Sequence, residues 1–183
     1  MLRTLFVTAA ALVLSANVAL ADSPGTKEDF QVFKDVAKSV NGYAWFTIFD
    51  DVSADVHDGV VTLTGKVTMP YKRDDIEKRV AKVPGVYKVD DRITVLPVSI
   101  WDNELRYRIA RSIYGNSNFW SYAATANPSI HIIVERGHVT LSGVVNGEVD
   151  RMLARALATQ FGAFSVTNNL KTTAEMRDAF ERS

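Results

Sequence analysis

The chain has 183 residues, of which 47% are hydrophobic and 23% are charged, so it has enough apolar material for one or two globular domains. Its 21 basic and 21 acidic side chains give a formal net charge of zero, which argues against a general nucleic-acid binder, because phosphates require a basic surplus. The absence of cysteine excludes disulfides, thiol catalysis, thiolate metal sites and a lipid-modified cysteine anchor.

The N-terminus has the three parts of a secretory signal. Met1-Leu2-Arg3 supplies the positive charge, an apolar run extends from Leu5 to Leu14, and Ala19-Leu20-Ala21 supplies small residues for cleavage. We therefore predict a signal peptide over residues 1–21, cleaved after Ala21, and a soluble periplasmic protein. The alternative is a retained membrane anchor, although the apolar run is interrupted and short for a span of ~20 residues.

Apolar residues recur at helical spacing from residue 30 to residue 40, which predicts a first helix that ends at Asn41-Gly42. The aromatic-rich stretch 43–49 fits a helix, a strand or a covered loop, and periodicity does not decide among them. From Val52 to Val67, apolar and polar residues alternate around the turn Asp58-Gly59, which predicts a β-hairpin, because Gly adopts the positive φ that a tight turn requires.

The apolar face of this hairpin needs a cover, because two strands alone are not stable in water. We expect a helix that begins at Asp74-Asp75, where the helix dipole favours negative charge, and ends at Pro84-Gly85. That position explains the two carboxylates better than acid–base catalysis does. A third strand is predicted from Val86 to Val95.

The second half of the chain repeats the order helix, hairpin, helix, strand. Asp102 is placed to cap its first helix, which ends near Gly115-Asn116, and an aromatic connector covers residues 118–127. The second hairpin turns at Arg136-Gly137. The helix that follows Asn146-Gly147 is expected to face inward with Val149, Leu153, Ala156 and Leu157.

Six glycines of the two repeats coincide in pairs, namely Gly59 with Gly137, Gly65 with Gly143 and, after one gap, Gly85 with Gly162. Two copies, each with a core of its own, predict a tandem of small domains over residues 27–97 and 100–172. A short helix or tail over residues 173–183 follows, in which Met176 and Phe180 could dock on the second domain. The predicted fold class is α+β, with two αββαβ domains, each a three-stranded mixed sheet with two helices packed on it.

Both repeats resemble the BON (bacterial OsmY and nodulation) domain family, whose hallmark is a G-x-V-x-L-x-G hairpin, a helix and a G-V-x-x-V-x-N-x-L-like strand. The resemblance covers nearly all of the chain after the signal. Two positions depart from the pattern, namely Asp91, where the second copy keeps Asn168, and Ala163, where Val is usual. The matching residues are Gly59, Val61, Leu63, Gly65, Val67, Gly85, Val86, Val89 and Ile93, then Gly137, Val139, Leu141, Gly143, Val145, Gly162, Val166, Asn168 and Leu170.

The resemblance implies a periplasmic or envelope protein without catalytic activity, in a family linked to osmotic stress, envelope integrity and attachment to phospholipid. The residues themselves show no catalytic or metal constellation. His57, His131 and His138 match no common zinc spacing, and the acidic residues between 50 and 58 lack the regular loop of an EF-hand. Ser142 lacks the surroundings of a nucleophile. We therefore expect no enzyme, no cofactor, no metal and no small-molecule substrate.

Surface attachment is the favoured function. On the helix that opens the second domain, arginines lie off the apolar stripe, with aromatic residues among them and just beyond. Arginine grips phosphate bidentately, and Trp and Tyr prefer the membrane interface. The same pattern also fits an ordinary amphipathic helix whose aromatics fill the core. The residues predicted to contact anionic phospholipid are Arg106, Tyr107, Arg108, Arg111, Tyr114, Phe119, Trp120 and Tyr122.

Local charge favours the second domain as the membrane-facing one, since residues 99–173 carry 7 basic and 5 acidic side chains, against 11 and 12 in residues 27–98. We expect an envelope-maintenance or stress-protection protein that binds anionic phospholipid surfaces peripherally. The alternative is a chaperone-like or adaptor module that binds envelope proteins through sheet edges or the same aromatic surface. Burial of the rings at 119–122 would remove the apolar half of the predicted lipid contact.

Overall fold

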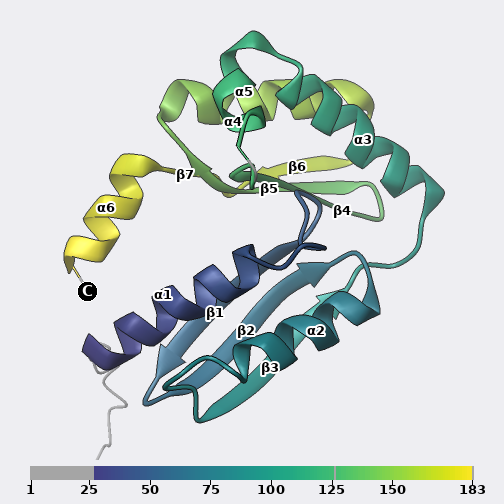
Figure 1. The fold of residues 1–183 in the computed structure, drawn as a ribbon. Coiled ribbons are helices and arrows are strands. Elements are labelled where there is room, and N and C mark those ends of the chain that lie inside the picture. The colour runs from purple at the N-terminus through teal and green to yellow at the C-terminus, as the bar shows by residue number, and fades with distance from the viewer. Residues whose placement is uncertain (1–26, 126, 183) are drawn as a thin grey trace, which may run out of the picture.

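The computed structural model describes residues 27–125 and 127–182, and the predicted signal peptide lies outside these residues. Two sheets, each with its own helical layer, form two successive domains (Figure 1). The structure confirms the predicted fold class of two tandem α+β domains. In the described part of the chain, no helix is long and apolar enough to cross a membrane.

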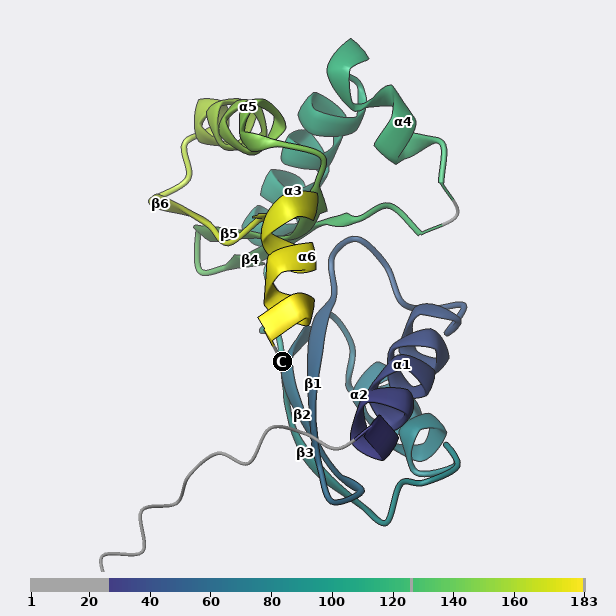
Figure 2. The same ribbon diagram turned by 90° about the vertical axis from the view of Figure 1, so that its left-hand side faces the viewer.

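The first domain is built from helices α1 (Lys27–Asn41) and α2 (Pro70–Val80) and strands β1 (Asp51–His57), β2 (Val60–Val67) and β3 (Lys88–Val95). Strand β2 lies in the centre, antiparallel to β1 and parallel to β3. Both helices cover the same face of this sheet (Figure 2), so the alternating apolar residues of the strands are buried beneath them.

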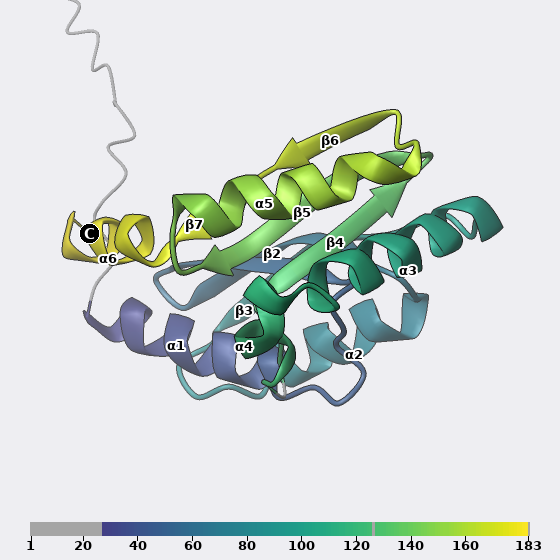
Figure 3. The ribbon, with the colours of Figure 1, turned by 90° about the horizontal axis from the view of Figure 1, so that it is seen from above.

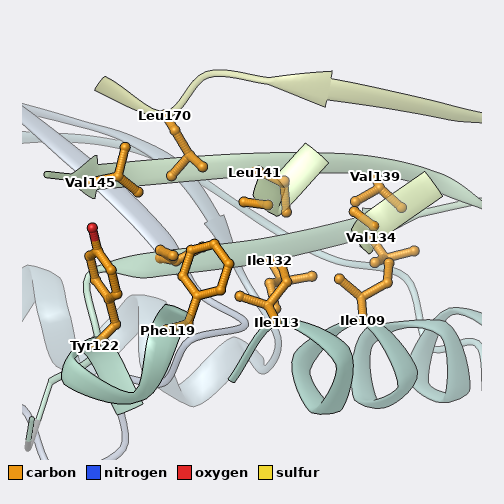
Figure 4. Close-up of a cluster of buried hydrophobic side chains, with 13 residues drawn as sticks. Ile109, Ile113, Phe119, Tyr122, Ile132, Val134, Val139, Leu141, Val145 and Leu170 are labelled. Carbon is orange, nitrogen blue, oxygen red and sulfur yellow. The ribbon is translucent and has the colours of Figure 1, made fainter. Parts of the chain in front are cut away.

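The second domain repeats this order with α3 (Ile100–Tyr114), β4 (Ile130–Glu135), β5 (His138–Val145), α5 (Glu148–Ala158) and β6 (Ser165–Asn168). The predicted last strand is split, because β6 and the short β7 both pair in parallel with β5. Its core lies between the sheet and the helices (Figure 4). The shorter elements are η1 (Ser117–Phe119), α4 (Trp120–Ala123), η2 (Thr159–Phe161), β7 (Lys171–Thr172) and α6 (Thr173–Arg182).

Both predicted hairpins are confirmed. The turn residues Asp58 and Gly59 have φ of 50° and 73°, and Arg136 and Gly137 have φ of 52° and 78°. Positive φ at both central residues is the type I′ geometry, whose twist matches that of the flanking strands. In each repeat, one residue other than glycine, Asp58 or Arg136, has left-handed backbone angles because the hairpin turn fixes that conformation.

Gly65 and Gly143 lie at the end of each hairpin that is opposite its turn, where the two strands come unusually close. A Cβ on Gly65 would lie 2.1 Å from the carbonyl oxygen of Asp51, and one on Gly143 would lie 1.9 Å from that of Ser129. Their φ values of 126° and 108° also lie in a region that side chains disfavour. These two positions of the repeated motif are therefore fixed by backbone packing.

Asn168 ties the last strand to the helix above it, since its Nδ2 donates to the Arg151 carbonyl at 2.8 Å and its Oδ1 accepts from the Leu170 amide at 3.3 Å. The corresponding carboxylate of Asp91 cannot donate a hydrogen bond. It lies 3.8 Å from the Nε of Arg73 instead, so an ion pair replaces the amide–carbonyl bond in the first domain.

Two predicted helix starts are wrong. Helix α2 begins at Pro70, because proline fits the first position of a helix, so Asp74 and Asp75 lie in the second turn and not at the dipole end. The Asp75 carboxylate instead accepts from the Tyr43 hydroxyl at 2.7 Å. Helix α3 is capped by Ser99, whose side chain accepts from the amide of Asp102, so Asp102 itself is not the cap.

The predicted inward face of α5 is also partly wrong. Val149 and Ala156 are exposed, whereas Ala154 and Ala158 are fully buried, because the helix packs its small residues against the sheet. The aromatic stretch 43–49 is a loop of turns that carries neither a helix nor a strand. This loop is covered in part by the second domain.

Helix α6 begins as predicted, with a capping box in which the amide of Glu175 donates to the Thr172 hydroxyl and the amide of Thr172 donates to the Glu175 carboxylate. An ion pair of 2.9 Å between Glu175 and Arg151 joins α6 to α5. Met176 is half-buried, whereas the Phe180 side chain lies outside the described residues.

The two domains contact each other directly. Figure 1 shows the sheet of the second domain between its own helices and the first domain, which covers its far face. In that contact the Ile132 amide donates to the Ile48 carbonyl at 2.7 Å, and Nδ1 of His131 lies 2.6 Å from the carbonyl oxygen of Asp50. An ion pair between Lys66 and Glu135 adds a charged contact, so the loop over 43–50 holds the second sheet at its β4 edge.

Candidate functional surface

Four of the eight predicted lipid-contact residues have side chains that are buried or half-buried in the second domain. The Arg106 side chain is only 4% exposed, and its guanidinium donates to the Val134 carbonyl at 2.6 Å and to Asn103 Oδ1 at 2.5 Å. Burial lowers the pKa of Arg106, and the nearby Asp102 carboxylate opposes that effect. This arginine therefore braces α3 against β4 and does not reach a membrane.

Phe119 and Tyr122 are buried like Arg106, and Tyr114 is half-buried against the same core. Phe119 and Tyr122 belong to the core (Figure 4), and the Tyr122 hydroxyl donates to Asp150 at 2.6 Å. The Tyr114 hydroxyl donates to the Ile130 carbonyl at 2.5 Å. The interpretation as core residues is correct for Phe119 and Tyr122, which are buried away from any lipid in this fold. The Tyr114 ring packs against the same core with its hydroxyl already bonded.

The other four residues are exposed. Tyr107, Arg108 and Arg111 lie on the outward face of α3, and Trp120 is exposed on α4, beyond the C-terminal end of that helix. Tyr107 is in edge contact with Phe49 of the first domain, with ring centroids 5.2 Å apart. The predicted cluster is thus divided between the surface and the interior.

The structure adds an apolar surface that the sequence analysis missed, at the N-terminal end of α3. Val98, Ile100 and Trp101 are exposed there, and Phe164 lies before β6 on the neighbouring loop. Trp101 is 81% exposed and Phe164 is 80% exposed. The sequence does contain a sign of this surface, because more apolar residues follow Pro97 than the buried stripe of α3 requires. We refer to Val98, Ile100, Trp101 and Phe164 as the apolar end.

A groove of about 520 Å³ separates Trp101 from Phe164. It runs between the start of α3, the β4–β5 turn and the loop that follows η2. Its lining therefore combines aromatic rings with guanidinium groups on one surface. Among its lining residues are Trp101, Leu105, Arg108, Arg136, Phe161 and Phe164.

The Asp102 carboxylate holds the walls of this groove together. It accepts from the Arg136 and Gly137 amides, each at 2.8 Å, and so fixes the hairpin turn against α3. The Phe164 amide donates to the Gly137 carbonyl at 2.9 Å, which ties the second wall to the same turn. In the first domain the Gly59 amide donates to Asp29 at 3.1 Å, so both repeats use this clamp.

The charges around the groove are partly unpaired. Arg108 makes only a long, exposed contact of 3.5 Å with Glu104. Among the described residues, no carboxylate forms an ion pair with Arg111 or Arg136. Both oxygens of Asp102 are already engaged by backbone amides, which reduces their repulsion of an anion. The surface therefore offers cationic groups beside exposed apolar rings.

The candidate metal and catalytic residues are dispersed. Asp50 is buried in an ion pair with Lys72, whereas His57 contacts Asp55 at 3.2 Å and His138 lies 2.8 Å from the Ser165 hydroxyl. Over residues 27–125 and 127–182, no group of three or more His, Asp or Glu side chains could hold a metal ion.

Comparison with protein families gives a match to the BON domain over residues 28–97 and 119–174. Among solved structures, the chain is similar to CdsD, a structural protein of the type III secretion system of Chlamydia trachomatis, at 11% identity and a TM-score of 0.29, covering 82% of this chain and 97% of that chain. For the C-terminal domain of CdsD the identity is 11%, the coverage 75% and 94%, and the TM-score 0.28. Comparison with curated proteins gave no match.

Proposed function

The chain belongs to the BON domain family, and on that premise we propose that it is a non-catalytic periplasmic protein that binds anionic phospholipid surfaces. Membership favours a role at the envelope or under stress, with attachment to phospholipid. The finer assignment made here is envelope maintenance through peripheral contact of the second domain with a membrane. Helix α3 and the groove beside it form the proposed contact surface.

The observation that carries this proposal is the apolar end next to Arg108 and Arg136. Large apolar side chains that the fold leaves exposed to water favour transfer to a less polar phase. Each one that becomes fully buried contributes roughly 1.5–3 kcal/mol to the free energy of binding. Trp and Phe at a surface rimmed by arginine suit the headgroup region, where rings are buried while charges stay hydrated.

The arginines supply the attraction to anionic lipid. Each basic side chain near such a surface contributes about 1 kcal/mol, so Arg108, Arg111 and Arg136 together supply on the order of 3 kcal/mol at low salt. Because exposed charges are screened within ~10 Å at 0.1 M salt, binding should weaken as ionic strength rises. Binding to uncharged phosphatidylcholine should be weaker at every salt concentration.

Vesicle co-sedimentation tests the proposal with the chain that lacks the predicted signal peptide. We expect binding to phosphatidylglycerol vesicles, with a loss of affinity of roughly tenfold or more for Trp101→Ser with Phe164→Ser. Trp120→Ser is the matched control, since it removes an exposed Trp away from the groove and should change affinity little.

A protein that ignores anionic vesicles at low salt would eliminate the lipid proposal. The alternative role, as a chaperone-like or adaptor module for envelope proteins, would then become the better assignment. Equal effects of Trp101→Ser and Trp120→Ser would show instead that exposed aromatics act without regard to the groove. Arg108→Gln with Arg136→Gln should remove most of the preference for anionic over neutral vesicles.

A further inference from the structure

We infer that the lipid-contacting surface is composite, and that the first domain contributes Met69 and Tyr71 to it. This inference rests on the proposed function and extends its surface from the second domain to the first. Met69 and Tyr71 precede and begin α2, and both are exposed, as is Pro70 between them. We call these three residues the α2 start.

The pairing of the first sheet places the α2 start at the same end as the apolar end. Strands β2 and β3 are parallel, with Val67 opposite Val95, and the Leu96 amide donates to the Val67 carbonyl at 2.9 Å. Both strands therefore end on the same side of the sheet. From there the chain continues from β2 into the α2 start and from β3 towards α3. Figures 1 and 3 show the first turns of α2 and α3 at one end of the molecule.

Met69 and Tyr71 do not belong to the core of the first domain. The buried side chains of α2 are Lys72, Ile76 and Val80, which face the sheet, and Met69 and Tyr71 lie outside that face. Tyr71 is 48% exposed, so about half of its surface remains available to a partner. Apolar side chains gathered at one end of a molecule are typical of a binding surface.

The contact between the domains fixes how the two parts of this surface face a membrane. The Ile132 amide and the His131 ring both hold the loop over 43–50, and Lys66 pairs with Glu135. A chain linker alone would let the domains tilt independently. With these contacts, the α2 start and the apolar end keep one relative orientation and can meet the same lipid surface.

The first domain also contains a matched control. Tyr87 is 87% exposed but lies just before β3, whose first residue, Lys88, pairs with Val60 at the start of β2. It therefore sits at the opposite end of the same sheet from Tyr71, next to the acidic turn residue Asp58. If exposure alone determined lipid contact, Tyr87 would be the better candidate of the two tyrosines.

Tryptophan probes at the two tyrosines test the inference. The chain has three Trp, at 45, 101 and 120, which are replaced by Phe so that Tyr71→Trp or Tyr87→Trp becomes the only source of Trp fluorescence. Vesicles of phosphatidylglycerol with brominated acyl chains quench a Trp that enters the bilayer. We expect the probe at 71 to be quenched and blue-shifted, and the probe at 87 to keep its emission.

A protein that retains only Trp101 is measured in the same assay to separate this inference from the proposed function. Quenching of Trp101 without quenching at 71 overturns the composite surface and leaves the proposed function standing. Equal quenching at 71 and 87 also overturns it, because contact would not be confined to one end. Absence of quenching at 71 and at 101 eliminates both proposals.

Affinity gives a second readout. Met69→Ser with Tyr71→Ser should weaken binding to phosphatidylglycerol vesicles by about tenfold, which corresponds to 1.4 kcal/mol of binding free energy. Tyr87→Ser should change it less than twofold. Thermal unfolding of each variant establishes that the fold is retained, and unchanged affinity in a folded Met69→Ser, Tyr71→Ser protein contradicts the inference.

Discussion

Replacing Asp50 by Ala should destabilise the first domain more than any surface substitution. The Asp50 carboxylate is fully buried and accepts hydrogen bonds from the amide and hydroxyl of Thr47, at 2.8 and 2.7 Å. It also accepts from the amide and hydroxyl of Thr68, each at 2.8 Å, and from Nζ of the buried Lys72 at 2.6 Å. It therefore joins the loop before β1 to the start of α2.

Asp50→Ala leaves the Lys72 ammonium buried without its partner and two backbone amides without an acceptor. Removing one member of a buried ion pair destabilises a protein by about 3–5 kcal/mol. The exposed pair Asp90–Arg92 is the control, for which Asp90→Ala should change stability by only ~0–1 kcal/mol. Urea unfolding followed by circular dichroism gives both free energies by linear extrapolation.

The double variant Asp50→Ala, Lys72→Met separates charge burial from the lost hydrogen bonds. It should be more stable than Asp50→Ala alone, because no unpaired charge remains inside, yet less stable than the natural chain, because the amides of Thr47 and Thr68 stay unsatisfied. A loss below about 1 kcal/mol for the single variant, or a double variant no more stable than the single, would refute the reasoning.

The same carboxylate predicts a pH dependence. Burial alone would raise the pKa of Asp50, but the hydrogen bonds from Lys72, Thr68 and Thr47 outweigh it and hold the pKa below its ordinary value of 3.8. A carboxylate whose pKa is lower in the folded state stabilises the fold above the unfolded pKa, and that stability is lost as pH falls through the folded pKa. Stability should therefore fall below about pH 4, and Asp50→Ala should lack this part of the decline.

Three further predictions concern the framework of the repeats. Gly143→Ala should cost at least about 3 kcal/mol, because its Cβ would overlap a backbone oxygen. Gly147→Ala meets nothing within 4 Å and should cost at most ~1 kcal/mol, as an Ala at the N-cap of α5. Similar urea midpoints for the two variants would contradict this. Asp102→Ala should destabilise the second domain by about 2–4 kcal/mol in the same assay and reduce vesicle binding by loosening the groove. Burial and a carboxylate partner raise the pKa of Tyr43 and of Tyr122 to about 12, so stability should decline from pH 10 to 12, and Tyr→Phe at either position should reduce that decline in alkaline unfolding.

Local patterns were enough to predict the repeated frame. Alternation around Asp58-Gly59 and Arg136-Gly137 determines a hairpin because turn geometry and side-chain alternation depend on neighbouring residues only. The start of α2 differs from the prediction because Pro70 determines it, and the acidic pair Asp74-Asp75 lies one turn further on. Both signals are local, and proline constrains the backbone more strongly than charge does.

The site depended on contacts that the sequence order does not reveal. Arg106 lies off the apolar stripe, yet its guanidinium is buried because the carbonyl of Val134, 28 residues away, accepts from it. The sequence position of Asp102 is that of a helix cap. In the fold its carboxylate instead accepts a hydrogen bond from the amide of Gly137, in the hairpin turn. Trp101 continues the i, i+4 spacing of Leu105 and would be read as core, but the helix extends past the sheet at that point and leaves the ring exposed.

Two copies of one frame make it possible to separate framework from function. Both hairpin turns are clamped by an aspartate of the first helix of their domain. In both, the carbonyl of the turn glycine accepts a hydrogen bond from the backbone amide of an exposed aromatic residue, Tyr87 or Phe164. The copies differ in the turn residue itself, which is Asp58 in the first domain and Arg136 in the second. Because the clamp uses only backbone amides of the turn, this side chain is free to vary without cost to the frame. Under the proposed function, this difference in charge makes the second domain the one that attracts an anionic lipid surface, at the end where the groove lies.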